Sequence, residues 1–149
     1  LQDEMDRILS PAAARVILPI TDPYVVHHGA LGSYATVYLA DDADVAHIVS
    51  ELKAIPGIEH VFTNKEGCDE FELAYDRMGD LILTSEKNTV LGTTASRHDL
   101  SGLTVPLRSH GGVTEQTVPL VFSRPATKLD ASHQLRNFDI FDIALNNVE

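Results

Sequence analysis

The residues best suited to chemistry lie in one polar stretch, Leu107 to Val121. The stretch reads LRSHGGVTEQTVPLV and places a guanidinium, a hydroxyl and an imidazole side by side at Arg108, Ser109 and His110. Imidazole is a common zinc ligand, and the two glycines that follow carry no β-carbon to crowd an ion or ligand. No HxExH, HExxH or CxxC motif stands nearby. The local sequence therefore fits both a metal ligand and an ordinary loop histidine.

Three other basic groups are candidates for binding an anion. His28 is adjacent to His27, and neighbouring residues of a strand point to opposite faces, so only one of the two lines a site unless the chain bends there. Arg15 stands at the start of a stretch rich in β-branched residues and is a candidate for carboxylate recognition. Arg108 either binds an anionic ligand or pairs with a surface acid.

Patterns of apolar residues predict the elements that position these groups. Helical spacing and capping residues predict helices over 1–9, 41–55, 64–71 and 138–148. β-Branched and alternating residues predict strands over 15–20, 33–40, 57–63, 80–85 and 118–122. The run at 80–85 is expected to be buried on both faces, and 118–122 is expected to be a buried strand. This order of elements predicts an α/β fold with a mixed sheet flanked by helices.

Composition limits the classes of function. With 149 residues and 44% apolar residues, the chain is long enough for one domain with a sizeable core. Lys and Arg number 11 against 22 Asp and Glu, and the net charge of −11 argues against nucleic acid or an anionic membrane as the main partner. A lone cysteine, Cys68, and the lack of a signal peptide or long apolar run predict a cytoplasmic location. A homodimer is left open.

Three stretches resemble one enzyme family. They are RSHGGVTEQTVPLV near the end of the chain, VILPITDPYVVHHGALGSYATVYL from Val16 to Leu39, and DRMGDLIL from Asp76 to Leu83. All three resemble the phosphonoacetate hydrolases, which are members of the alkaline phosphatase superfamily. The long second stretch is specific, whereas DxxGDL occurs across the superfamily. With the spacing between them, the three stretches cover most of the chain.

The resemblance implies a hydrolase that splits phosphonoacetate at its carbon–phosphorus bond, with two zinc ions held by Asp and His ligands and a Thr nucleophile. No DHG metal motif and no Thr nucleophile motif occur in the chain, so no catalytic residue is assigned within it. Residues 1–149 are expected to be a single domain or fragment, the C-terminal part of such an enzyme, with 34–75 as a small α/β insert. His110 is the expected zinc ligand. His28, Arg108 and Arg15 are the expected substrate-binding residues.

A single imidazole cannot make a tight zinc site, because such sites need three or four protein donors. The chain alone is therefore expected to bind zinc poorly and to be inactive. Two other classes stay open. One is a different enzyme of the superfamily, such as a phosphodiesterase or phosphomutase. The other is a non-catalytic module whose acidic surface serves dimerisation.

Overall fold

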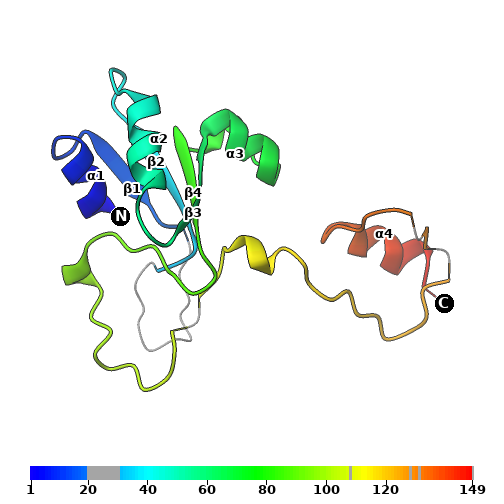
Figure 1. Cartoon of the computed structure of the whole chain (residues 1–149). Coiled ribbons are helices and arrows are strands. Elements are labelled where there is room, and N and C mark those ends of the chain that lie inside the picture. Colours follow the sequence, from blue (N-terminus) through cyan, green and yellow to red (C-terminus); the bar gives the residue numbers. More distant parts are fainter. Residues whose placement is uncertain (20–30, 108, 128, 131, 149) are drawn as a thin grey trace. The chain divides into compact units, whose positions relative to one another are not determined.

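The computed structural model describes residues 1–19, 31–107, 109–127, 129–130 and 132–148 (Figure 1). The chain divides into two compact units, Leu1–Gln116 and Thr117–Glu149. The sequence predicts one domain or fragment; the structure places the candidate zinc ligand and all four strands in the first unit. That residues 34–75 form an insert within a larger fold stays a prediction.

A four-stranded sheet organises the first unit. Its strands are β1 (Ala14–Ile17), β2 (Tyr34–Leu39), β3 (Ile58–Thr63) and β4 (Leu81–Ser85), in the order β1-β2-β4-β3. Every hydrogen-bonded pair is antiparallel, so the predicted mixed sheet is wrong. The reason is the place of β4. β2 and β3 run in the same direction, as in a strand–helix–strand unit, but β4 lies between them and pairs antiparallel with both.

One face of this sheet is sealed by two helices, α1 (Gln2–Ile8) and α2 (Val45–Lys53). Met5 of α1 and Ile48 and Leu52 of α2 are fully buried, and they belong to one apolar cluster with Ala35 and Val37 of β2. Both helices lie within the ranges predicted from apolar periodicity. The α/β class is therefore confirmed, while the pairing of the strands is not.

The other face is covered on the β3–β4 side by α3 (Asn64–Phe71). A β-carbon added at Gly67 of this helix would lie 2.8 Å from the Ile82 side chain and 3.2 Å from that of Phe62, so the helix packs very closely on these two strands. β4 is buried along its whole length, as predicted from its apolar run. The segment after α3 forms a short 3-10 helix, η1 (Tyr75–Arg77), and returns the chain to β4.

The rest of the described chain is less regular. Two further 3-10 helices, η2 (Ala95–Arg97) and η3 (Val113–Glu115), lie in the long connection after β4. The second unit contains α4 (Asp139–Asn146), with Ile143 buried, and a bridge between Ala126 and Val148. The described residues include no helix long and apolar enough to cross a membrane.

The predicted buried strand over 118–122 is wrong. These residues form no strand, and Val118 and Val121 are 65% and 80% exposed. An apolar run becomes a strand only when another strand pairs with it, and Pro119 removes one of the N–H groups that such pairing uses.

Candidate functional site

The loop that carries His110 is fastened to the start of β2. The backbone N–H of Ser33 donates to the carbonyl of His110 at 2.8 Å. Ser109 Oγ donates to the carbonyl of Leu31 at 2.5 Å. These two bonds join residues far apart in the sequence and hold the backbone of the candidate ligand against the sheet. The structure therefore presents His110 from an anchored turn.

A carboxylate lies beside the His110 imidazole. Glu115 Oε1 is 3.9 Å from His110 Nδ1, and Glu115 Oε2 accepts a 2.8 Å hydrogen bond from the N–H of Gly111. The His110 side chain is 62% exposed, so a ligand can reach the ring. At 3.9 Å the carboxylate is a charged neighbour of the ring, and its negative charge favours the orientation that turns Nδ1 toward it. This pair is the chemical centre of the candidate site.

The described residues do not complete a metal centre. A zinc site needs three or four protein donors. No group of three or more His, Cys, Asp or Glu side chains in the described part of the chain is arranged to hold a metal. His110 fits the role of one imidazole donor, with Glu115 as the neighbouring carboxylate. Zinc binding at His110 would need further donors from outside the described residues.

The structure places one of the three predicted substrate-binding residues. Arg15 is exposed on β1, opposite Tyr38 of β2. His28 and Arg108 lie outside the described residues, so their roles stay predictions.

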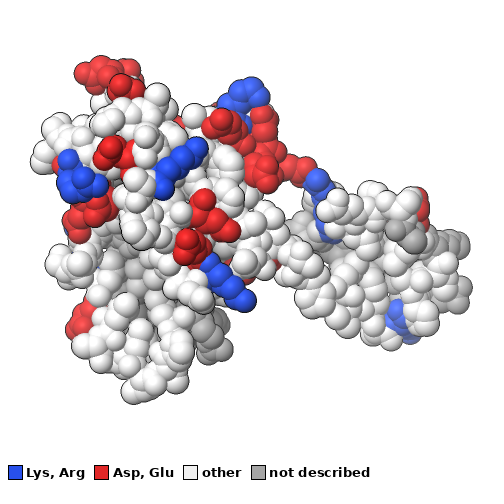
Figure 2. Space-filling model, in the orientation of Figure 1, with Lys and Arg blue, Asp and Glu red and all other residues white. Residues whose placement is uncertain are grey.

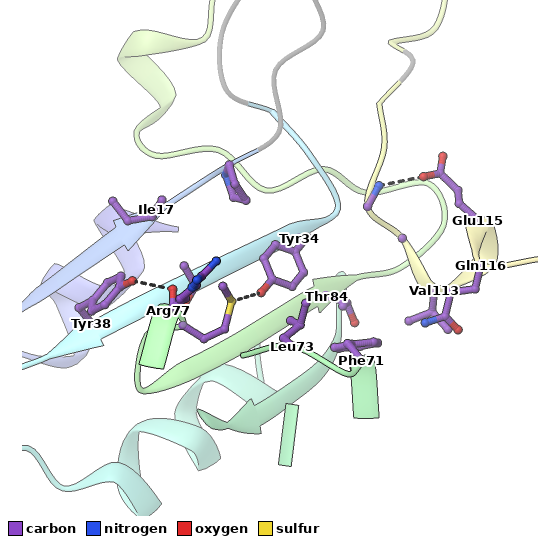
Figure 3. Close-up of a pocket in the computed structure, with 15 residues that line it drawn as sticks. Ile17, Tyr34, Tyr38, Phe71, Leu73, Arg77, Thr84, Val113, Glu115 and Gln116 are labelled. Carbon is purple, nitrogen blue, oxygen red and sulfur yellow. Dashed lines mark hydrogen bonds between the residues drawn. The ribbon is translucent and has the colours of Figure 1, made fainter. Parts of the chain in front are cut away.

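A cavity of about 600 Å³ lies between the open part of the sheet and the His110 loop (Figure 3). Three groups of residues line it. The sheet and the residues just after β1 contribute Ile17, Pro19, Tyr34, Thr36, Tyr38 and Thr84; the region around α3 and η1 contributes Phe71, Leu73, Arg77 and Met78; and the loop contributes Gly111, Gly112, Val113, Glu115 and Gln116. No motif in the sequence predicts this cavity. Its one local signal is the alternation of Tyr34, Thr36 and Tyr38 along β2.

Two tyrosine hydroxyls tie the cavity wall together. Tyr34 Oη donates to Met78 Sδ at 3.3 Å, and Tyr38 Oη donates to the carbonyl of Arg77 at 3.4 Å (Figure 3). Burial is the main cause that raises the pKa of Tyr34 above its ordinary value. Tyr34 therefore stays a neutral donor at physiological pH. The cavity wall is mainly apolar, with Arg77 and Glu115 as its charged residues among the described ones.

Comparison with known proteins adds to this geometry. No family model matches the chain. A protein of Penicillium oxalicum described as phosphonoacetate hydrolase is 35% identical over 77 residues, which are 50% of this chain and 93% of that protein. The chain belongs to the phosphonoacetate hydrolase family. The resemblance predicted from the three sequence stretches is thereby confirmed.

Two crystal structures of a phosphonoacetate hydrolase from Sinorhizobium meliloti 1021 are similar to this member of the family. One is a complex with phosphonoacetate and the other a complex with phosphonoformate. Each is 54% identical to the chain and matches 98% of it, with TM-scores of 0.84 and 0.85. The chain spans 35% of the length of those hydrolase chains. About two thirds of the phosphonoacetate hydrolase fold therefore lies outside the matched region.

Proposed function

We propose that this chain is part of a zinc-dependent phosphonoacetate hydrolase, in which His110 is one metal ligand. The observation that carries the proposal is the 54% identity, over 98% of the chain, to a hydrolase crystallised with phosphonoacetate. The accessible, anchored imidazole beside Glu115 supports the assignment of His110. The remaining ligands and the nucleophile are proposed to lie in polypeptide outside this chain.

The proposed reaction breaks the carbon–phosphorus bond of phosphonoacetate. An oxygen bonds to phosphorus, the carbon leaves and takes up a proton, and acetate and phosphate result after the uptake of one water. Bound zinc supplies positive charge that stabilises the phosphonyl oxygens. The chain's own part is to present the His110 imidazole at the start of β2, with Glu115 beside it. Arg15, His28 and Arg108 are the proposed contacts for the charged ends of the substrate, since guanidinium groups pair well with such anions.

The test uses a chimera in which this chain replaces the matched third of the Sinorhizobium meliloti hydrolase. The chimera is expected to release phosphate and acetate from phosphonoacetate. His110→Ala is expected to lower kcat/KM by about 100-fold or more and to lower the zinc content measured by mass spectrometry, because a metal ligand is lost. The isolated chain is expected to have no measurable activity.

His133→Ala is the matched control. His133 is 59% exposed and its Nε2 lies 3.4 Å from Asp139 Oδ2, so it is also an accessible imidazole beside a carboxylate. We expect its substitution to leave both activity and zinc content unchanged. Equal activity in the two substituted chimeras would remove His110 from the site. Hydrolysis of phosphonoacetate by the isolated chain would contradict the need for outside ligands.

A further inference from the structure

The two faces of β2 have different surroundings in the first unit. Ala35 and Val37 are fully buried under α1 and α2. Tyr34, Thr36 and Tyr38 alternate with them and line the cavity of about 600 Å³ on the other face. β2 is an interior strand of the sheet, with β1 on one side and β4 on the other. In the described part of the first unit this face is incompletely covered, since Tyr38 is 41% exposed and sheets bury apolar faces against another element.

Charge distinguishes this face from the rest of the first unit. Acidic side chains gather over α3, where Figure 2 shows them on the surface. In the cavity, by contrast, the charged residues among the described ones are Arg77 and Glu115. Arg15 is directly opposite Tyr38 in the antiparallel β1–β2 pair, and opposite residues point to the same face. The open face is therefore mainly apolar, and its charged residues among the described ones are Arg15, Arg77 and Glu115.

We propose that the open face, formed by β1, β2 and the cavity, is an internal interface of the complete hydrolase. Its occupant is the polypeptide that makes up the other two thirds of the matched fold, of which this chain spans 35%. The inference rests on the proposed function, which identifies the occupant, and on the cavity, which locates the interface. Gly111 and Glu115 line the same cavity, so polypeptide seated there also lies against the loop that presents His110. The packing that covers the sheet is the same packing that brings further donors toward the imidazole.

A matched pair of substitutions tests this interface. Tyr38 is 41% exposed on the open face, and Val45 is 37% exposed at the first position of α2, which packs on the opposite face of the sheet. In the isolated chain, Tyr38→Glu and Val45→Glu each are expected to shift Tm by less than about 3 °C, because both side chains already meet water and the hydrogen bond from Tyr38 to the Arg77 carbonyl is exposed. In the chimera, Tyr38→Glu is expected to lower Tm by about 5 °C or more, because the new carboxylate becomes buried. Val45→Glu is expected to have no such effect.

Hydroxyl-radical labelling gives a second readout that needs no substitution. Tyr38 is expected to be modified several-fold more slowly in the chimera than in the isolated chain. Tyr75, which is 52% exposed and does not line the cavity, serves as the internal reference. Labelling of Tyr38 at the same rate in both proteins would overturn the interface.

Two further outcomes separate this inference from the proposed function. If His110→Ala abolishes activity while Tyr38 stays accessible in the chimera, the interface fails and the function stands. If the chimera is inactive but buries Tyr38, the interface stands and the function fails. Light scattering of the isolated chain tests the other candidate occupant, which is a second copy of the chain. A dimer that Tyr38→Glu converts to a monomer would assign the open face to a second copy and overturn the proposal.

Discussion

At the scale of single residues, the two glycines after His110 have different roles. Gly111 has a φ of 93°, in the left-handed region, where its N–H meets the Glu115 carboxylate. Gly112 has a φ of −78°, and a β-carbon added there would lie 3.5 Å from Ser33 Cβ, an ordinary contact. A side chain at a left-handed position costs roughly 1–2 kcal/mol. The turn that presents His110 therefore requires glycine at one of the two positions.

Substitution of these glycines gives a direct test. Gly111→Ala is expected to lower the free energy of unfolding of the chain by about 1–2 kcal/mol in urea titrations, because the backbone is strained. In the chimera it is also expected to lower zinc content, since the Glu115 contact and the His110 turn move together. Gly112→Ala is the control and is expected to change neither quantity. Equal effects of the two substitutions would show that backbone conformation does not set the position of His110.

The sequence predicts His110 as a zinc ligand, but it does not predict that Glu115 lies beside it. A few consecutive residues are enough to identify an imidazole next to paired glycines and to predict that it could serve as a ligand. Glu115 is one acid in a polar turn, and its contact depends on the 3-10 helix η3 that turns the chain back toward residue 110. The cavity is harder still to predict, because Tyr34, Leu73 and Gly111 meet only after the sheet has formed.

At the scale of elements, α3 begins with a reciprocal cap. The N–H of Thr63 donates to Glu66 Oε2 at 2.9 Å, and the N–H of Glu66 donates to Thr63 Oγ1 at 3.4 Å. The hydrogen bonds from Thr63, first its backbone N–H and then its hydroxyl, lower the pKa of Glu66 below its ordinary value of 4.5. A carboxylate with a lowered pKa stabilises the fold when ionised. Its contribution is present above pH 4.5 and is lost as the pH falls through the lowered pKa.

The cap predicts a pH-dependent difference between two variants. At neutral pH, Glu66→Gln is expected to lower Tm relative to the unsubstituted chain, because the charged half of the cap is gone. As the pH falls below the lowered pKa of Glu66 the difference is expected to shrink, since the carboxylate is then protonated in both the folded and the unfolded states. Glu70→Gln changes another exposed acid of α3 and is the control. A difference that is constant across this range would mean that the Glu66 charge plays no part in the cap.

The positions of the elements follow from the sequence better than their pairing. Apolar periodicity within α2 and the unbroken apolar run of β4 are local properties, and both predictions are confirmed. Strand order is not local: β4 enters between β2 and β3 from nearly 20 residues downstream of β3, which no pattern in β2 or β3 reveals. The run at 118–122 has the right composition for a strand and lacks a partner among the described residues.

At the scale of the whole molecule, the main core belongs to the first unit. The buried members of its apolar cluster extend from Met5 to Leu91. The second unit, Thr117–Glu149, has Ile143 buried within it, whereas Phe138, Phe141 and Leu145 are 58%, 72% and 82% exposed. Burial of apolar surface is the main source of folding stability. The stability of the chain is therefore concentrated in residues 1–116.

Deletion of residues 117–149 tests this distribution. Residues 1–116 are expected to unfold in urea in one cooperative transition with nearly the same midpoint as the whole chain, because the apolar cluster is intact. Met5→Ala in the shortened chain is the control and is expected to cost about 2–5 kcal/mol, since Met5 is fully buried in that cluster. A large fall in the midpoint on deletion, comparable with that of Met5→Ala, would mean that the sheet depends on the second unit. The core would then include residues beyond Leu91.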